Sequence, residues 1–459
     1  MCGIAGFCSL KRCYTDRQSF WENILVSMHE KLIHRGGDAS GIYLTPHAGL
    51  SHQRLSIRDI THGAQPMIRH RDGADYAIVY NGEIYNTDEL IPELTAAGYN
   101  FLTTSDTEVI LYAYMHFGAS FVSRLNGIFS FAIWDGAAKQ LFLYRDRVGT
   151  KPLFYHAKDG ELVFASEPKA LFCFPDLSPA ITENSLRELL AVGPARTPGC
   201  GVFQDIYEVL PGHYLCFDAM GLSDTTYWDL KCLPHTDSYE DTVAHVSFLM
   251  RDTVKRQMIS DVPIGTFLSG GLDSSLLSSL ANQVMQEQGR ELHTFSVDYR
   301  DNDRYFQKSH FQPTSDPTYI RAMERYLGCQ HHWTVLDTPA LAEALYAAVD
   351  ARDLPGMVDV DSSLLLFCRE IRQEVTVALS GECADELFGG YPWYRDADIR
   401  RINGFPWAQS TAYRTQFLLP EIAAEIDAQA YVQSAYARTV AAAEKLPDDS
   451  PLESRMREM

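Results

Sequence analysis

Short apolar runs separated by turn residues dominate the first half of the chain. They predict strands over residues 128–134, 140–145, 152–155 and 161–165, with Asp-Gly pairs as turns. Helical spacing predicts one helix over residues 15–32 and another over residues 109–117. We therefore expect an antiparallel sheet covered by helices in this half, an α+β layered domain.

Strands and helices alternate in the second half. A helix over residues 238–258 leads into an apolar, strand-like approach at 262–268. Strand-like residues then alternate with helical spacing, the strands at 293–298, 332–336 and 375–379 and the helices at 318–327 and 363–374. This alternation is typical of a parallel sheet with helices on both faces, and the ligands of such sheets lie beyond the carboxyl ends of the strands.

Composition narrows the class of protein. The chain has 459 residues, enough for two or three domains of ~150 residues. Its net charge of −21 argues against a nucleic-acid surface. The ten cysteines include no Cys-x-x-Cys pair, which argues against a zinc site. No signal region and no run of ~18 apolar residues occurs, so we expect no membrane segment and a cytoplasmic protein with reduced thiols.

A glycine- and serine-rich string follows the approach at 262–268. It reads Ser269-Gly270-Gly271-Leu272-Asp273-Ser274-Ser275 and lies where a strand turns into a helix. Backbone N–H groups at such a turn favour an anion, and Asp273 beside it suits a bridging metal ion. The alternative is an ordinary glycine turn with serine caps. No Gly-Lys-Ser/Thr follows, so the string is not a Walker A loop; it resembles the pyrophosphate-binding loop of ATP pyrophosphatases.

A second polar string, Ser380-Gly381-Glu382-Cys383-Ala384-Asp385-Glu386, follows the strand predicted at 375–379. Its acidic residues fit either a solvated helix face or a functional site. Because it comes directly after a buried strand, as the Ser269 string does, one ligand could touch both.

The first half has chemical candidates of its own. Removal of Met1 would leave Cys2 as the N-terminus, with its own α-amine as a base for the thiol. Asn81-Gly82 lies in an alternating run, where it fits either a hairpin turn or a pair of donors for an oxyanion. Ser105 to Glu108 reads locally as a capping box.

Taken in order, these pieces resemble the glutamine amidotransferase domain of the N-terminal-nucleophile class. The matching strings are Cys-Gly-Ile-Ala-Gly, Gln-Arg-Leu-Ser-Ile, Asn-Gly-Glu-Ile-Tyr-Asn and Ser-Asp-Thr-Glu, over about residues 2–210. The resemblance implies that glutamine is hydrolysed by Cys2. It also implies that Asn81 and Gly82 stabilise the oxyanion, and that the glutamine site is formed by Arg54, Leu55, Ile57, Asn81, Gly82, Glu83 and Asp106.

The two strings of the second half, joined to this domain, resemble glutamine-hydrolysing asparagine synthetases. The implied reaction converts aspartate and ATP to β-aspartyl-AMP and pyrophosphate, and ammonia from glutamine then displaces AMP. Glu382 would be catalytic, and Mg²⁺ would be held by Asp273 and Asp385. The implied ATP and pyrophosphate contacts are Leu268, Ser269, Gly270, Gly271, Asp273, Ser274, Ser275, Val297, Ser380 and Gly381.

The resemblance implies an N-terminal-nucleophile amidotransferase sandwich followed by an α/β doubly wound parallel-sheet synthetase domain. We expect the amidotransferase at residues 1–210, a linker at 211–237 and the synthetase at 238–459. The partners implied are glutamine, aspartate and ATP, with no nucleic acid and no membrane, and a homodimer is left open.

Three positions depart from the family pattern. Gly37 stands where proline is usual, and Cys383 where glycine is usual. A helix start at Ser450 is followed by only a few residues, so we expect a synthetase domain that is incomplete at its C-terminal end. Two alternatives therefore stay open: a chain that is only a glutaminase, and an enzyme of the same architecture that amidates another carboxylate.

Overall fold

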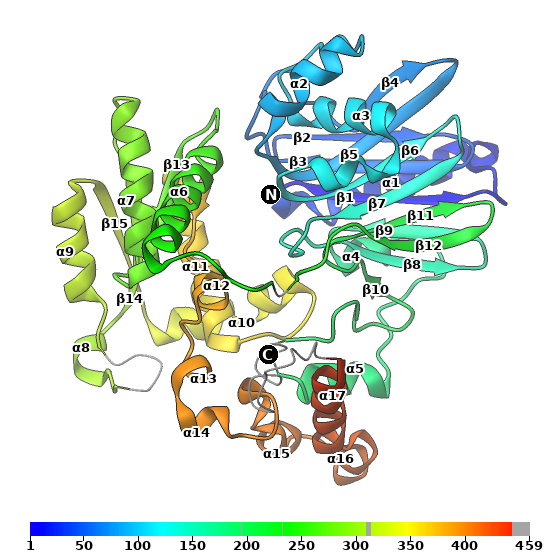
Figure 1. Ribbon diagram of the computed structural model, residues 1–459. Coiled ribbons are helices and arrows are strands. Elements are labelled where there is room, and N and C mark those ends of the chain that lie inside the picture. The colour runs from blue at the N-terminus through cyan, green and yellow to red at the C-terminus, as the bar shows by residue number, and fades with distance from the viewer. Residues whose placement is uncertain (194, 232, 309–313, 443–459) are drawn as a thin grey trace. The chain divides into compact units, whose positions relative to one another are not determined.

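The computed structural model describes residues 1–193, 195–231, 233–308 and 314–442 (Figure 1). Its contacts divide the chain into two compact units. The first comprises Met1–Ile181 and Pro198–Asp237, and the second comprises Thr182–Thr197 and Ser238–Met459. These units differ from the predicted ranges in two respects: residues 182–197 pack with the second unit, and the predicted linker at 211–237 belongs to the first. The helix start expected at Ser450 lies outside the described residues.

Two six-stranded antiparallel sheets form the first unit. The first sheet has the order β10-β8-β9-β1-β3-β2, and the second has the order β12-β11-β7-β6-β5-β4. The strands are β1 (Gly3–Ser9), β2 (Ala39–Leu44), β3 (Ala48–Arg54), β4 (Met67–Arg71), β5 (Ala74–Ile84), β6 (Gly127–Asp135), β7 (Gln140–Arg145), β8 (Phe154–Lys158), β9 (Glu161–Ala165), β10 (Tyr207–Glu208), β11 (His213–Asp218) and β12 (Gly221–Thr226). Part of the predicted linker thus completes the second sheet as β11 and β12.

Helices cover the outer faces of both sheets in this unit. They are η1 (Tyr14–Arg17), α1 (Gln18–Glu30), η2 (Ile33–Arg35), α2 (Thr87–Ala96), α3 (Asp106–Phe117), η3 (Ala119–Arg124) and α4 (Pro168–Leu171). α1 and α4 pack on the first sheet, and α2, α3 and η3 on the second. The helix predicted over 15–32 is therefore divided into η1 and α1, and the helix that the string Ser105 to Glu108 was predicted to open begins at Asp106.

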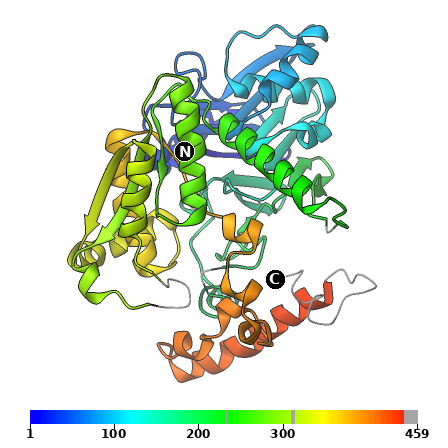
Figure 2. The same cartoon turned by 60° about the vertical axis from the view of Figure 1, so that its left-hand side comes forward.

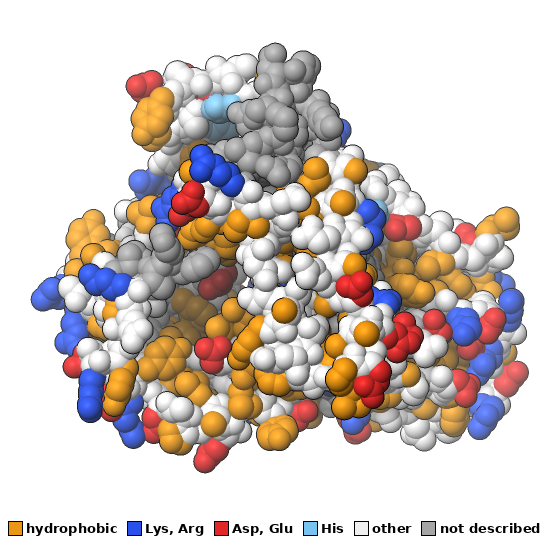
Figure 3. Space-filling view, turned by 90° about the horizontal axis from the view of Figure 1, so that it is seen from below, with side chains coloured by type: hydrophobic (Ala, Val, Ile, Leu, Met, Phe, Trp, Pro, Cys, Tyr) orange, Lys and Arg blue, Asp and Glu red, His pale blue; other side chains and the backbone are white. Residues whose placement is uncertain are grey.

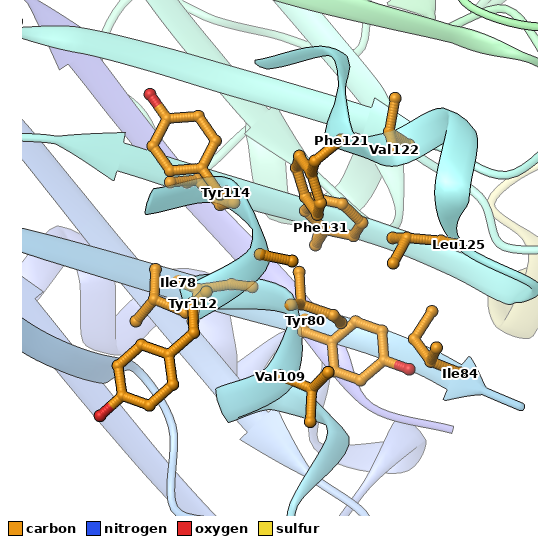
Figure 4. Close-up of a cluster of buried hydrophobic side chains, with 14 of the residues drawn as sticks. Ile78, Tyr80, Ile84, Val109, Tyr112, Tyr114, Phe121, Val122, Leu125 and Phe131 are labelled. Carbon is orange, nitrogen blue, oxygen red and sulfur yellow. The ribbon is translucent and has the colours of Figure 1, made fainter. Parts of the chain in front are cut away.

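Apolar side chains fill the space between the two sheets. Ile4 and Leu50 from the first sheet meet Val79, Ala132 and Leu143 from the second, all fully buried. A second cluster lies between β5, β6, α3 and η3; Figure 4 shows Tyr80 beside Val109 of α3, and Phe131 beside Phe121 of η3. Because apolar groups cover both faces of β5, its polar residues are held in a rigid setting.

A parallel four-stranded sheet organises the second unit, in the order β15-β14-β13-β16. Its strands are β13 (Ile264–Phe267), β14 (His293–Tyr299), β15 (Gln330–Leu336) and β16 (Val377–Leu379). The helices around it are α6 (Tyr239–Gln257), α7 (Leu272–Glu287), α8 (Asn302–Tyr305), α9 (Pro317–Leu327), α10 (Thr338–Arg352) and α11 (Val358–Glu374). α6 and α7 lie side by side on one face and α11 packs on the other, which is a doubly wound arrangement (Figure 2).

A series of mostly short helices and the longer α17 end the described chain. They are α12 (Ala384–Phe388), α13 (Pro392–Arg395), α14 (Ala397–Arg400), η4 (Pro406–Ala408), α15 (Thr411–Thr415), α16 (Pro420–Ile426) and α17 (Ala428–Ala442). The last three pack with α5 (Glu183–Leu190) (Figure 1). Arg187 of α5 donates to the carbonyl oxygen of Ile426 at 2.9 Å, and Tyr431 donates to Glu188. These contacts explain why residues 182–197 belong to the second unit.

Among the described residues, no helix is long and apolar enough to cross a membrane. On the face drawn in Figure 3, apolar side chains are interspersed with basic and acidic ones.

Candidate active sites

Cys2 lies directly before β1, the strand whose burial fixes the start of the chain. Every residue of β1 is buried, and Gly3 pairs with Gln53 of β3. The Cys2 thiol lies between two backbone groups of one residue: its Sγ is 3.4 Å from the Leu55 nitrogen and 3.5 Å from the Leu55 oxygen. The sheet thus holds the thiol against the segment that follows β3.

Burial raises the pKa of the Cys2 thiol. The Leu55 N–H, the chain's amino terminus and Arg54 oppose this shift, and Glu83 adds to it. The thiol is therefore protonated at neutral pH, and a base must take its proton before or during attack on a substrate.

Asn81 and Gly82 lie inside β5 and form no hairpin turn, so this alternative is wrong. Asn81 is 1 % exposed and its Nδ2 has no hydrogen-bond partner. A Cβ at Gly82 would stand 2.2 Å from the carbonyl oxygen of Ile128 on β6, so only glycine fits there. Both residues line the same cavity as Cys2. An unpaired buried donor of a residue that lines the same cavity as a nucleophile suits an oxyanion, because such a donor otherwise costs free energy.

Asp106 opens α3 and faces the same cavity. Its Oδ2 accepts from the Tyr80 hydroxyl at 2.9 Å and the Ile84 N–H at 3.1 Å. Burial raises the pKa of Asp106, and the charge of Arg58 opposes that rise. The carboxylate is thus held in place by β5 and can receive a ligand ammonium.

The capping box predicted at Ser105 does not form. The Ser105 side chain accepts from the Thr107 N–H at 3.3 Å, but the Glu108 carboxylate turns away from the helix start. It accepts from the backbone N–H groups of Leu102 and Thr103 and from the Arg69 guanidinium. Ser105 thus still caps α3, and Glu108 forms an ion pair with Arg69 instead of completing the box.

Arg54 is buried beside the cavity, and part of its guanidinium is already engaged. It donates to the carbonyl oxygens of Arg58, Asp59 and Ile60 at 2.7 to 3.3 Å. Three of its five N–H donors are thus used to hold this loop, which leaves donors for a ligand carboxylate. Leu55, Ile57 and Glu83 also line the cavity, so the structure brings together every predicted glutamine-site residue.

In the second unit, the Ser269 string forms the turn between β13 and α7. The hydroxyl of Ser274 closes this turn, because it accepts from the Ser269 N–H at 3.1 Å and lies 2.9 Å from the Ser269 hydroxyl. Gly270 has φ +78°, and a Cβ there would stand 2.9 Å from the Ile320 nitrogen. The first N–H groups of α7 have no intrahelical partner, which makes this turn a site for an anion.

The second string meets the first at the carboxyl ends of the strands. A Cβ at Gly381 would lie 3.1 Å from the Ser274 nitrogen, so the two turns are in contact. Cys383 has φ +70° and ψ 2°, a left-handed conformation that glycine adopts more easily. The Glu382 N–H donates to the Ser380 hydroxyl at 3.1 Å.

The carboxylates of Asp273 and Asp385 are suited to binding a cation. Desolvation raises the pKa of Asp385, and the negative charges of Asp273 and Glu386 raise it further, while Arg395 opposes the shift. Two carboxylates that repel each other beside an anion-binding turn fit a divalent cation such as Mg²⁺, whose preferred ligands are oxygen atoms.

A cavity of about 650 Å³ lies between the two turns. The predicted residues that line it are Leu268, Ser269, Gly271, Asp273, Ser274, Val297, Ser380, Gly381, Glu382 and Asp385. Gly270 and Ser275 do not line it. Because Gly270 has no side chain, α9 can pack closely against it. The Ser275 N–H donates to the carbonyl oxygen of Gly271 at the start of α7.

Comparisons with known proteins cover both units. The family model of the glutamine amidotransferase domain matches residues 1–228, and that of asparagine synthase matches residues 245–459. The glutamine-hydrolysing asparagine synthetase 3 of Bacillus subtilis is 43 % identical over 460 residues, which cover 100 % of this chain and 74 % of that protein. The chain belongs to the family of glutamine-hydrolysing asparagine synthetases.

Other relatives of this asparagine synthetase family member are more distant. Asparagine synthetase 1 of B. subtilis is 34 % identical over 86 % of this chain, which spans 60 % of that protein's length. A solved structure of glutamine phosphoribosylpyrophosphate amidotransferase from B. subtilis is 15 % identical in sequence. The match covers 86 % of this chain and 94 % of the solved chain. The TM-score of this match is 0.39.

Several site residues of this asparagine synthetase family member were missed from the sequence. The Arg35 Nε donates to the Cys2 carbonyl oxygen at 2.9 Å, and its Nη1 lies 2.6 Å from the Glu167 carboxylate. The Lys151 amine lies 3.1 Å from the Met1 sulfur at the same cavity, and burial, followed by the charge of Arg35, lowers its pKa. Tyr299 lines the second cavity. These are single residues far apart in sequence, so no local spacing indicates them.

Proposed function

We propose that this chain converts aspartate to asparagine with ATP, using ammonia that it releases from glutamine. The observation that carries the proposal is the unpaired, buried amide of Asn81, a residue that lines the same cavity as Cys2 in the first unit. The second unit supports the proposal with an anion-binding turn and paired carboxylates. The alternatives of a glutaminase alone and of another acceptor carboxylate are not favoured, because the family matches extend through both units and name asparagine synthase.

The glutaminase half begins with removal of Met1, which frees the α-amine of Cys2. This amine takes the thiol proton, a step that the raised pKa of the buried thiol requires. The thiolate attacks the carboxamide carbon of glutamine, and the oxyanion is met by Asn81 and Gly82. The amine then donates its proton to the leaving ammonia, and water releases glutamate from the thioester.

The same cavity supplies groups for the two charged ends of glutamine. The remaining donors of Arg54 bind the α-carboxylate. Glu83 and Asp106 receive the α-ammonium, and the backbone at Leu55 and Ile57 borders the substrate. In this assignment the positive guanidinium of Arg54 binds the negative end of glutamine, and the negative carboxylates of Glu83 and Asp106 bind its positive end.

The synthetase half works at the carboxyl ends of the parallel strands. Ser269, Gly271 and Ser274 hold the pyrophosphate portion of ATP, while Leu268, Val297, Ser380 and Gly381 border the rest of the nucleotide. Asp273 and Asp385 hold Mg²⁺, which supplies charge neutralisation for the phosphates. The aspartate side chain attacks the α-phosphate, pyrophosphate leaves, and Glu382 takes a proton from the ammonia that displaces AMP.

A cytoplasmic location and a homodimer are part of this proposal. A cytoplasmic location predicts that all cysteines of the freshly purified chain react as free thiols. A homodimer predicts twice the chain mass in light scattering. Disulfides, or a monomer at all concentrations, would contradict these two points without affecting the proposed reaction.

The test is one incubation of the purified chain with amide-¹⁵N glutamine, aspartate and Mg-ATP, read by mass spectrometry. We expect ¹⁵N-asparagine, glutamate, AMP and pyrophosphate, and no labelled product from the Cys2→Ala variant. Glutamate without asparagine would overturn the synthetase half of the proposal. Glutamine hydrolysis that survives in Cys2→Ala would overturn the nucleophile.

A further inference from the structure

Two histidines and a glutamate meet in the second unit. His293 opens β14, His332 is the third residue of β15, and Glu374 ends α11. One ligand atom from each lies within 4.8 Å of the others. None of the three lines the 650 Å³ cavity, so the cluster is separate from the proposed ATP site.

Strand register explains why the two rings face each other. His332 pairs with Phe295, which lies two residues after His293 on β14. Since side chains alternate along a strand, both histidines are on one face of the sheet. α11 covers that face through Ile371, which packs with Phe295, and the same helix carries Glu374. Three elements distant in sequence therefore deliver one ligand group each.

The separation of the ring nitrogens suits one metal ion. His293 Nδ1 and His332 Nε2 are 3.1 Å apart. Two nitrogens that bind one tetrahedral zinc at ~2.0–2.1 Å lie about 3.3–3.4 Å apart, so a small ring movement brings both into range. Glu374 is exposed, so rotation of its side chain can bring the carboxylate to the ion. Neutral imidazole is the metal-binding form, and an ordinary histidine is mostly neutral at pH 7.

The geometry points to a divalent transition-metal site formed by His293, His332 and Glu374, with Zn²⁺ as the ion that suits two imidazoles and a carboxylate. Water fills the fourth position. The ion ties β14 and β15 to the end of α11, so its binding stabilises the second unit. Cysteine spacing could not indicate this site, because it contains no cysteine. The competing explanation is one N–H···N hydrogen bond between the two rings, with no metal affinity.

The test uses the full chain, freed of metals with a chelator and kept in excess Mg²⁺ so that Asp273 and Asp385 are occupied. Co²⁺ is the probe, since four-coordinate Co²⁺ has intense visible absorption. We expect one equivalent to give this spectrum and Zn²⁺ to displace it. Glu374→Gln should weaken Co²⁺ binding at least by the ~10- to 100-fold that loss of an outer-shell partner costs.

Replacement of the exposed Glu374 by cysteine makes the test specific. Glu374→Cys should retain Co²⁺ and add a thiolate-to-metal charge-transfer band. Glu370→Cys, exposed one turn earlier on α11, should bind Co²⁺ as the unmodified chain does, without the band. Absence of the visible spectrum in the unmodified chain, equal affinity in Glu374→Gln, or the same band in both cysteine variants would each overturn the metal site and leave the hydrogen-bonded pair.

Discussion

The guanidinium of Arg35 holds Cys2 by its backbone, with Nε 2.9 Å from the Cys2 carbonyl oxygen. Arg35 is itself fixed by the Glu167 carboxylate at 2.6 Å. Arg35 therefore touches the residue proposed as nucleophile without touching its thiol, and we assign it a positioning role.

Replacement of Arg35 should damage glutamine use and spare the use of free ammonia. In Arg35→Lys the planar fork is lost, and displacement of the thiol by even ~1 Å can cost about 10²-fold. We expect glutamine-dependent asparagine formation to fall 10- to 100-fold, with ammonia-dependent formation unchanged. Steady-state assays with each nitrogen source measure this. A parallel loss with both sources would instead indicate a general defect of folding.

Asn81→Ala should lower kcat for glutamine hydrolysis by about 10²- to 10³-fold, the usual cost of one oxyanion donor, with little change in KM. Its neighbour across the strand pair, Ser130, also has a buried and unpartnered side-chain oxygen, and Ser130→Ala is the matched control. If both variants keep their kcat, the Asn81 amide has no role in the transition state.

Glu167 should contribute stability that depends on pH. Burial opposes its ionisation, but His34 and Arg35 outweigh burial and lower its pKa from 4.5 to about 2. The contribution, about 3 kcal/mol, is present above pH 4.5 and is lost as the pH falls towards 2. In urea titrations, the gap in unfolding free energy between the parent chain and Glu167→Gln should shrink over this range. A gap that is constant from pH 7 to pH 3 would contradict the ion-pair account.

Cys383→Gly should stabilise the second unit by roughly 0.5–1 kcal/mol. The left-handed conformation at φ +70° costs an L-residue more than it costs glycine, and this gain exceeds the greater entropy that glycine loses on folding. Ala384→Gly, in the first turn of α12, should destabilise the chain instead. Urea midpoints compare the two, and a destabilised Cys383→Gly variant would show that the thiol itself contributes.

Two adjacent glycines should respond in opposite directions to alanine. A Cβ at Gly37 has open space around it, so Gly37→Ala should add about 0.4–1 kcal/mol by restricting the unfolded chain. A Cβ at Gly36 would stand 2.3 Å from the Arg54 carbonyl carbon, so Gly36→Ala should destabilise the chain and reduce glutamine hydrolysis. Thermal unfolding with a glutaminase assay measures both. An equal response would indicate that the loop rearranges around either side chain.

Sequence patterns predicted the two layered folds well, because burial and strand alternation depend on local apolar spacing. They located Cys2, Asp106 and both polar turns through short contiguous strings. They could not decide whether Asn81-Gly82 turns or continues a strand, since that depends on pairing with β6. They missed Arg35 and Lys151 for the same reason: Arg35 reaches the Cys2 backbone, and Lys151 the cavity, only after the sheets assemble.

Sequence patterns also gave the wrong role for residues that bind or pack against a partner distant in sequence. Glu108 leaves the helix cap because Arg69 and the 102–103 backbone offer it stronger bonds. Gly270 lies in the predicted turn, but its lack of a side chain serves the close packing of α9 instead of the lining of the cavity.

The placement of Asn81 within β5 has a consequence for motion. Its strand pairs with β6 from Tyr76 to Ile84, a stretch that includes Asn81, and with β4 from Ala74 to Ile78, and apolar clusters cover both of its faces. Local fluctuations open termini and loops first and reach such strands only in global unfolding. The backbone amides around Asn81 therefore belong to the slowest hydrogen-exchanging class of the first unit, and the oxyanion donor keeps its position for as long as the sandwich itself persists.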